Sequence, residues 1–425
     1  MIFVMKEEFL HSIWKLKNFN LHQLKTTDED ELVISHFGTH NHDSGPDFLN
    51  AKIVLKKTIW VGHIEIHINS SDWEKHKHQN DRAYDNVILH VVYNMDKSIH
   101  NSKGQTIPTL ELKSRIDTSL IENYQNLISG LDWIPCAPQL HKIDNQRVSL
   151  YLEKLHVERL VTKSMRLMSL LEENKNDWEA AMYALILKYL GLKINGAAFE
   201  QLSFQLPFHV FKKYTHNLLQ LEALLFGQAG LLHSKDEYIK KLSKEYQHLK
   251  KKHELTPMSG VEWQFSRLRP ANFPTIRLAQ LAMLYHRTPL LFNALILNSD
   301  LNHIKEIFSF RASKYWDTHY IPNKTSPFKE KTLGKTTMNI LVINAIVPLI
   351  FTYSRMLNNQ KLTDRSIDIL NGLPSEKNQI LTHWSQYGIN SRNAANSQAL
   401  IELKTQYCDN YKCLNCHIGQ QLLFK

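Results

Sequence analysis

The strongest constraint on the fold is a strict alternation of polar and apolar side chains from His63 to Ile68, within an apolar run that begins at Ile59. The alternating residues are His63, Glu65 and His67 on the polar side and Ile64, Ile66 and Ile68 on the apolar side. Successive side chains of a β-strand point to opposite faces, so the pattern predicts a strand with one polar face and one core face. Residues 47–55 form a second run rich in β-branched and aromatic residues, which predicts that the two segments pair as a hairpin.

The length of the hairpin loop decides whether Asp47 joins the polar face. Residues 56–58 separate the two runs, so we expect a loop of three residues, either 55–57 or 56–58. That loop places Asp47 across from Glu65 or His67 on the same face, whereas a two-residue loop would place Asp47 on the opposite face. The candidate site therefore depends on the longer loop.

Asp47, Glu65 and His67 on one face have the chemistry of a metal-assisted phosphodiesterase. Two carboxylates within about 4–6 Å of each other repel, and a divalent cation removes that cost. Mg²⁺ and Mn²⁺ favour carboxylate oxygens, so Asp47 and Glu65 are the expected metal ligands. Such an ion polarises a phosphate and lowers the pKa of a bound water, and His67 is placed to take the proton of that water. We therefore predict that these three residues are catalytic.

The order of the expected elements resembles a known fold. A first helix carries Glu7 and Glu8. Three strands are expected to follow near residues 31–36, 47–55 and 59–68, then a helix over residues 72–84 and a strand over residues 86–93. This αβββαβ order, with Ser44-Gly45-Pro46-Asp47 and Glu65-Ile66-His67, resembles the PD-(D/E)XK nuclease superfamily. The resemblance covers roughly residues 5–95 and implies a restriction-endonuclease-like core.

The resemblance also implies a role for each matching residue. Asp47 matches the acid that follows the proline, and Glu65 matches the second acid. Glu8 or Glu7 matches the acid that some members supply from the first helix, and we take Glu8 as the additional metal ligand. His67 stands where the motif has lysine. The implied activity is that of a nuclease, a hydrolase that cleaves DNA or RNA with Mg²⁺ or Mn²⁺.

The whole chain is also similar to a bacterial family of unknown function, of the DUF2851 type. The similarity rests on the run from Gly38 through residues 44–48 to residues 60–67, and on the cysteine-rich end. That family implies no activity. Because the motif lysine is replaced, a second hypothesis is a catalytically inactive scaffold that keeps the nuclease-like fold and binds nucleic acid.

A crowd of histidines in the same part of the chain supports a third hypothesis. The polar residues concerned are His36, His40, His42, Asp43, His76, His78, Asp81 and His90. Neutral imidazoles are the commonest transition-metal ligands, and His63, Glu65 and His67 make a two-histidine, one-carboxylate set. A cupin-like enzyme would hold such a set inside a β-barrel, but helix follows soon after residue 145 and leaves few strands to close a barrel.

The cysteines predict a second metal site. Three of the four cysteines lie near the C-terminal end in a C-x4-C-x2-C pattern: Cys408, Cys413 and Cys416. A tetrahedral Zn²⁺ or an iron-sulfur cluster needs a fourth ligand, which Cys136 supplies most simply, with His417 and Asp409 as alternatives. The arrangement resembles, loosely, the cluster that pins the C-terminus of helicase-nuclease relatives of the PD-(D/E)XK group and the cysteine run of endonuclease-III-type glycosylases. Both resemblances imply a staple or a DNA-contact element rather than a hydrolytic centre.

The periodicity changes to a helical one after Asp144, where apolar residues recur at three- and four-residue steps. Further helices are predicted over residues 177–190, 217–226, 235–253, 275–285, 339–356 and 375–384. We therefore expect an α+β (α/β) domain over residues 1–140, followed by a mostly α-helical domain over residues 141–425 that ends in the cysteine staple.

The formal net charge of +10 favours nucleic acid as a partner. The residues that we predict to contact phosphate are Arg267, Arg269, Arg277, Lys163 and Arg166. The alternative for the last two, which lie on the long predicted helix, is an ordinary solvated basic face.

We find no targeting signal in the sequence, which favours a cytoplasmic protein without a membrane partner. The chain turns acidic at Glu7 before any apolar run could act as a signal peptide. The longest apolar stretch, residues 338–353, contains Asn339, Asn344 and Pro348 and is too short to span a bilayer, so it predicts a buried helix. Four cysteines without an export signal do not predict structural disulfides.

Overall fold

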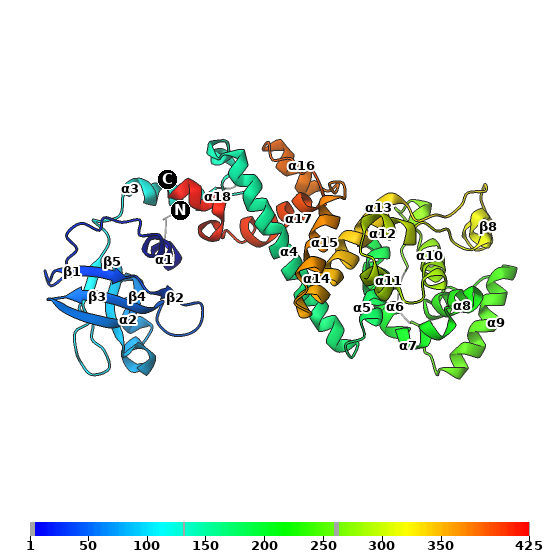
Figure 1. Ribbon diagram of the computed structural model, residues 1–425, viewed down its shortest axis with the longest axis horizontal. Coiled ribbons are helices and arrows are strands. Elements are labelled where there is room, and N and C mark those ends of the chain that lie inside the picture. Colours follow the sequence, from blue (N-terminus) through cyan, green and yellow to red (C-terminus); the bar gives the residue numbers. More distant parts are fainter. Residues whose placement is uncertain (1–4, 131, 259–262, 425) are drawn as a thin grey trace. The chain divides into compact units, whose positions relative to one another are not determined.

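The computed structural model describes residues 5–130, 132–258 and 263–424 (Figure 1). The chain divides into two compact units, one comprising Met1–Tyr151 with Leu403–Lys425 and the other comprising Leu152–Glu402. The sequence predicts a domain boundary near residue 140, whereas this division places it after Tyr151. The C-terminal segment, which the sequence analysis assigned to the helical domain, groups with the N-terminal unit.

The first unit contains a mixed β-sheet. Its strands are β1 (Leu32–His36), β2 (Thr39–His40), β3 (Phe48–Leu55), β4 (Thr58–Asn69), β5 (Val87–Asn94) and β6 (Thr109–Glu111). The strand order is β1-β3-β4-β5-β6, with β2 also paired to β3. Strands β1, β3 and β4 are antiparallel, whereas β4, β5 and β6 run parallel. A mixed sheet followed by mostly helical structure confirms the predicted fold class at this level.

The hairpin between β3 and β4 differs from the prediction. Its loop has two residues, Lys56 and Lys57, which have φ angles of 51° and 67° and leave Leu55 paired with Thr58. The expected three-residue loop is therefore wrong. Positive φ at both central positions is the geometry that joins twisted antiparallel strands most closely, and here two lysines adopt it without glycine.

A β-bulge in β3 restores the register that the two-residue loop would have lost. Ala51 pairs with Gly62, but Phe48 pairs with Ile64, so two residues of β3 oppose one residue of β4. Asn50, in the bulge, has a φ of 58°, a conformation that asparagine tolerates better than most residues. The extra residue moves Asp47 back to the face that carries Glu65.

Helices and short turns cover the sheet. They are α1 (Glu7–Leu16), α2 (Asp72–Lys75), the 3₁₀ turns η1 (His78–Asn80) and η2 (Arg82–Tyr84), and α3 (Thr118–Ile128). Helix α1 is amphipathic and buries Phe9, Leu10, Ile13 and Trp14. The helix expected over residues 72–84 is broken after Lys75, because Lys77 takes a left-handed conformation with a φ of 64°. This broken segment connects β4 to the parallel strand β5.

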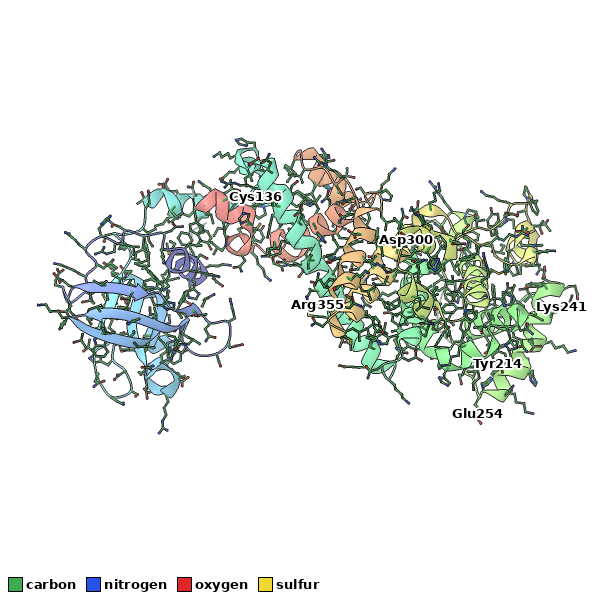
Figure 2. The ribbon with its side chains drawn as sticks, in the orientation of Figure 1. Cys136, Tyr214, Lys241, Glu254, Asp300 and Arg355 are labelled. Carbon is green, nitrogen blue, oxygen red and sulfur yellow. The ribbon has the colours of Figure 1, made fainter. Side chains whose placement is uncertain are left out.

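Four further elements complete the first unit. They are η3 (Ala137–Lys142), the π-helical turn η8 (Leu403–Cys408), η9 (Cys413–Asn415) and α18 (His417–Leu423). Helix α4 (Asn145–Glu173) spans the division between the units. Figure 2 labels Cys136, just before η3, next to the C-terminal segment.

The second unit is helical apart from a two-stranded sheet. Its helices are α5 (Trp178–Leu190), α6 (Leu192–Gln205), α7 (Phe208–Phe211), α8 (Leu218–Gln228), α9 (Glu237–Lys252), α10 (Pro274–Arg287), α11 (Leu291–Leu297), α12 (Leu301–Ile307), α13 (Lys335–Leu341), α14 (Val347–Met356), α15 (Gln360–Asn371), α16 (Gln379–Gln386) and α17 (Ala394–Glu402). The shorter elements are η4 (Lys212–Tyr214), η5 (Pro270–Asn272), η6 (Lys314–Thr318), β7 (His319–Ile321), β8 (Lys324–Thr325) and the π-helical η7 (Val342–Ile346). One large apolar core unites α5, α8, α10 and α14.

The most apolar helix of the described residues runs from Lys335 to Met356 through α13, η7 and α14. It is long and apolar enough to cross a membrane, but 72% of its apolar window is buried inside the protein. This burial confirms the prediction of a buried helix over residues 338–353.

Candidate metal centre

Asp47 and Glu65 meet across strands β3 and β4. The backbone N–H of Asp47 donates to Oε2 of Glu65 over 3.1 Å, and the backbone N–H of Ile66 donates to Oδ2 of Asp47 over 2.9 Å. Glu65 is only 5% exposed. Burial, and after it the charge of Asp47, raises the pKa of Glu65 to about 9. A buried carboxylate beside a second acid needs either a proton or a cation, so this pair is a candidate metal position.

Helix α1 contributes two further side chains to the acidic pair. Nε2 of His11 lies 3.2 Å from Oδ2 of Asp47. Burial acts to lower the pKa of His11, but its close contact with Asp47 and the charge of Asp47 outweigh that effect and raise it. Glu7 lies one helical turn before His11. Burial raises the pKa of Glu7. The charges of His76 and His11 lower this pKa, and the charge of Asp47 raises it.

Of the two acids at the start of helix α1, Glu7 rather than Glu8 interacts electrostatically with Asp47. Glu8 is exposed, and its charge acts on Tyr124 instead. The two residues are neighbours in the chain, and a helix turns adjacent side chains by about 100°, so only one of them can face the site.

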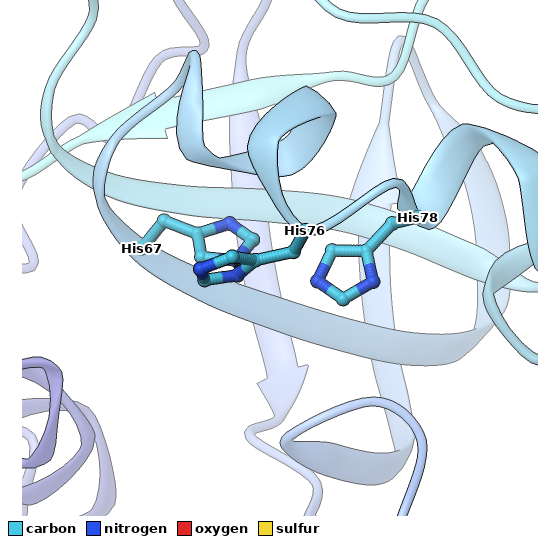
Figure 3. Close-up of side chains that lie close together, drawn as sticks. All are labelled: His67, His76 and His78. Atoms are coloured by element: carbon cyan, nitrogen blue, oxygen red, sulfur yellow. Dashed lines mark hydrogen bonds between the residues drawn. The ribbon is translucent and has the colours of Figure 1, made fainter.

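Three histidines, His67, His76 and His78, lie close together (Figure 3). Nε2 of His67 lies 3.1 Å from Nδ1 of His76. Oε1 of Glu65 lies 3.3 Å from Nε2 of His78 and 3.6 Å from Nε2 of His67. One ring nitrogen from each of the three histidines falls within 4.8 Å of the others. This group can hold a metal ion.

The chain between β4 and β5 brings His76 and His78 to this position. His76 ends α2, and the left-handed Lys77 turns the chain so that His78 starts η1 on the same side. The ring of His78 stacks on Tyr84 with centroids 3.8 Å apart, and the buried Trp73 lies edge-on to His78. These aromatic contacts fix the orientation of the imidazole.

His67 is enclosed on both ring nitrogens. Its Nδ1 lies 2.8 Å from Nε2 of His90 on β5, and its Nε2 faces His76. Burial, followed by the charges of His90 and His78, lowers the pKa of His67 to about 2, and burial lowers that of His90 to about 3. These contacts suit a ligand better than the proton acceptor that the sequence analysis expected, and His11 is the more accessible imidazole beside Asp47.

His63 does not join this group. Its Nδ1 accepts the backbone N–H of Asn50 at the bulge over 3.3 Å. The sheet ends at β1 and β6 in its described order. The cupin-like alternative with His63, Glu65 and His67 therefore lacks both its ligand set and its barrel among the described residues. His40, from the same polar crowd, packs on Phe48.

All four predicted cysteine ligands lie in the first unit as free thiols. Cys136, Cys413 and Cys416 are buried, while Cys408 is partly exposed. Burial, and after it the charges of Cys416 and Cys413, raises the pKa of Cys136 to about 12. Burial and the charges of the other three thiols likewise raise the pKa of Cys408. The four side chains are thus close enough to influence one another electrostatically, although they come from segments far apart in the sequence.

The predicted phosphate contacts divide into two groups. Arg277 is 2% exposed and donates to Gln280, Asn272 and Thr337, so its guanidinium is used inside the second unit. Lys163 donates to the carbonyl of Ile343 and to Asn344, and Arg166 pairs with Glu200. The phosphate-binding prediction does not fit Arg277 and Lys163, because their cationic ends are enclosed. Arg267 and Arg269 are exposed.

Comparison with known proteins gives a family match but no activity. The family model described as a protein of unknown function, DUF2851, matches residues 7–379. No curated protein and no solved structure matches the chain.

Proposed function

Because the chain belongs to the DUF2851 family, whose description names no function, we propose from its site geometry that it is a divalent-metal-dependent hydrolase of phosphodiester bonds, a nuclease. The observation that carries the proposal is the pairing of Asp47 with Glu65, which is buried beside it. A buried carboxylate beside a second, partly buried acid is costly to maintain without a proton or a cation, and this favours a metal-dependent function.

The order of elements supports a nuclease among metal-dependent hydrolases. Helix α1, the antiparallel strands β1, β3 and β4, the α2 crossover and the parallel strand β5 follow the αβββαβ order of the PD-(D/E)XK core. Asp47 precedes the second of these long strands, and Glu65 lies in the third. These are the positions that the resemblance gives to the two metal-binding acids.

Each residue of the site then has a role that its contacts support. Asp47 and Glu65 would hold the cation, Mg²⁺ or Mn²⁺, with Glu7 as a third acid in place of Glu8. When bound, the cation supplies polarisation of a phosphoryl oxygen and a lowered pKa of the attacking water. His11, with 18% of its side chain exposed and its Nε2 held beside Asp47, accepts a proton from that water when it is neutral.

Nucleic acid is the proposed substrate. The net charge of +10 favours a polyanion, and the exposed Arg267 and Arg269 are available for phosphate contacts in the second unit. The inactive scaffold of the second hypothesis would use the same basic residues without the acidic pair.

The test is cleavage of labelled single- and double-stranded DNA and RNA with Mg²⁺ or Mn²⁺. Asp47→Asn and Glu65→Gln should each reduce cleavage by about 100-fold or more, since removing electrostatic stabilisation of a transition state has effects of this order. Asp43→Asn, an exposed acid four residues before Asp47, is the matched control and should keep full activity. Equal cleavage by all variants would mean a contaminating nuclease. Binding without cleavage under every condition would leave the scaffold instead.

A further inference from the structure

We propose that His67, His76 and His78 form a second metal position, for a transition-metal ion, and that Glu65 bridges it to the position beside Asp47. The catalytic part of this inference rests on the proposed function. The histidine site itself rests only on the contacts around Glu65. The two positions would form a two-metal centre of the kind that hydrolytic enzymes use on phosphate esters.

Three of the separations between the proposed ligand atoms are close to those of tetrahedral coordination. A metal with ligands at about 2.0–2.1 Å separates neighbouring ligand atoms by about 3.3 Å in a tetrahedron. The observed separations are 3.1 Å from His67 to His76, 3.3 Å from His78 to Glu65 and 3.6 Å from His67 to Glu65. One ring nitrogen of each histidine thus lies within 4.8 Å of the others, and Oε1 of Glu65 lies beside two of these histidines.

His78 gives an independent sign of a missing ligand. Its Nε2 is buried and makes no hydrogen bond to any described residue, although Oε1 of Glu65 lies only 3.3 Å away. A buried ring nitrogen without a partner is costly, and coordination to a cation would satisfy both this nitrogen and the carboxylate. The unsatisfied atom lies beside Oε1 of Glu65, where one cation would contact both.

The donor set selects the type of metal. Three imidazoles with one carboxylate suit Zn²⁺, Fe²⁺, Mn²⁺ or Co²⁺, whereas Mg²⁺ prefers oxygen ligands. The contact of His67 with His90 would orient the ring and fix which nitrogen faces the metal, as partners beyond the ligands usually do. His76 is exposed, so an ion can reach the site from solvent.

Glu65 is suited to bridge because its two oxygens face different groups. Oε2 accepts the backbone N–H of Asp47, and Oε1 faces the histidines. A carboxylate that binds one ion through each oxygen holds the two ions about 3.5–4 Å apart. Glu65 therefore belongs to both positions, whereas Asp47 belongs only to the first and His76 and His78 only to the second.

The experiment is a titration of the metal-free full-length protein with Co²⁺, followed by visible absorption. The wild type should bind one Co²⁺ ion at the histidine site, with the visible bands of a tetrahedral, nitrogen-rich site. His76→Ala and His78→Ala should weaken this binding by at least about tenfold. His42→Ala, an exposed histidine of the same region, is the matched control and should bind as the wild type does. Cobalt bound to cysteine would show intense near-ultraviolet thiolate absorption, which the histidine variants should not alter.

The outcomes separate this inference from the proposed function. The histidine site would be overturned if the wild type showed no visible Co²⁺ bands, or if His76→Ala and His78→Ala left the bands unchanged. Either result would hold even if the protein cleaves nucleic acid. Histidine-dependent bands in a protein that cleaves nothing would keep the site and remove the nuclease. Histidine-dependent bands together with cleavage that His76→Ala reduces would support both.

Discussion

Asn50 places Asp47 opposite Glu65. The two-residue loop at Lys56 and Lys57 by itself would turn Asp47 to the other face of the sheet, and the bulge at Asn50 adds the residue that reverses this shift. The candidate site thus depends on one asparagine whose side chain is not part of it.

Substitutions of Asn50 should therefore separate backbone conformation from side-chain chemistry. Asn50 has a φ of 58°, so Asn50→Val should destabilise the first unit by about 1–2 kcal/mol, the cost of a left-handed conformation for such a residue, and should reduce metal binding. Asn50→Gly should keep both properties, because glycine adopts positive φ without strain. Chemical denaturation and isothermal titration with Mn²⁺ measure these effects. Equal behaviour of the two variants would show that the bulge does not control the register.

Glu7 and Glu8 provide a paired test of the first helix. The charges of Asp47 and His11 shift the pKa of Glu7. Glu8 is exposed, and its charge raises the pKa of Tyr124 instead. Glu7→Gln should weaken Mn²⁺ binding and cleavage by about tenfold, since it removes one carboxylate from the site, and Glu8→Gln should leave both unchanged. Isothermal titration with Mn²⁺ and the cleavage assay provide the comparison. A larger loss in Glu8→Gln would restore the assignment made from the sequence.

The sequence was sufficient for the four longer strands β1, β3, β4 and β5, but not for the short strands β2 and β6 or for the connections. Alternation from His63 to Ile68 predicted β4 and its two faces, because the two-residue period depends only on local geometry. The turn was mispredicted because two lysines adopt positive φ, which is usual only for glycine and asparagine. The bulge at Asn50 lies within a β-like run and leaves no periodic signal, so two errors cancelled at Asp47.

The metal ligands required tertiary information. His76 and His78 were noticed as part of a histidine-rich segment, but their approach to Glu65 depends on the left-handed Lys77 and on packing against Tyr84. His11 gave no signal of its own, although its spacing of four residues from Glu7 would place both on one helical face. In the second unit, the sequence could not distinguish the buried Arg277 from an exposed arginine.

Lys163 should make the stability of the second unit depend on pH. Burial, and after it the charge of Arg159, lowers the pKa of Lys163 to about 7 from an ordinary value of 10.5. Between these values the unfolded chain binds more protons than the folded chain, so stability should rise with pH from about 7 to about 10, by up to about 1.4 kcal/mol per pH unit. Below pH 7 both states are protonated, and this contribution to the slope disappears.

Denaturation of the wild type and of Lys163→Met between pH 6 and pH 10 measures this contribution. The variant should lose the rise above pH 7, whatever its absolute stability. Lys193→Met, an exposed lysine of the same unit, should keep the rise. The same slope in all three proteins would mean that Lys163 titrates normally.

The cysteines should bind one metal centre per chain and connect the C-terminal segment to the rest of the first unit. Each of Cys136→Ser, Cys408→Ser, Cys413→Ser and Cys416→Ser should reduce bound Zn²⁺ or iron and lower the melting temperature, because a structural metal contributes directly to folding. Elemental analysis and absorption near 400 nm distinguish zinc from an iron-sulfur cluster. His417→Ala is the control, since His417 is the alternative fourth ligand. Metal lost in His417→Ala but retained in Cys136→Ser would replace Cys136 in the ligand set. Unchanged metal content in all five variants would show that the thiols hold no metal and remain neutral in the folded protein.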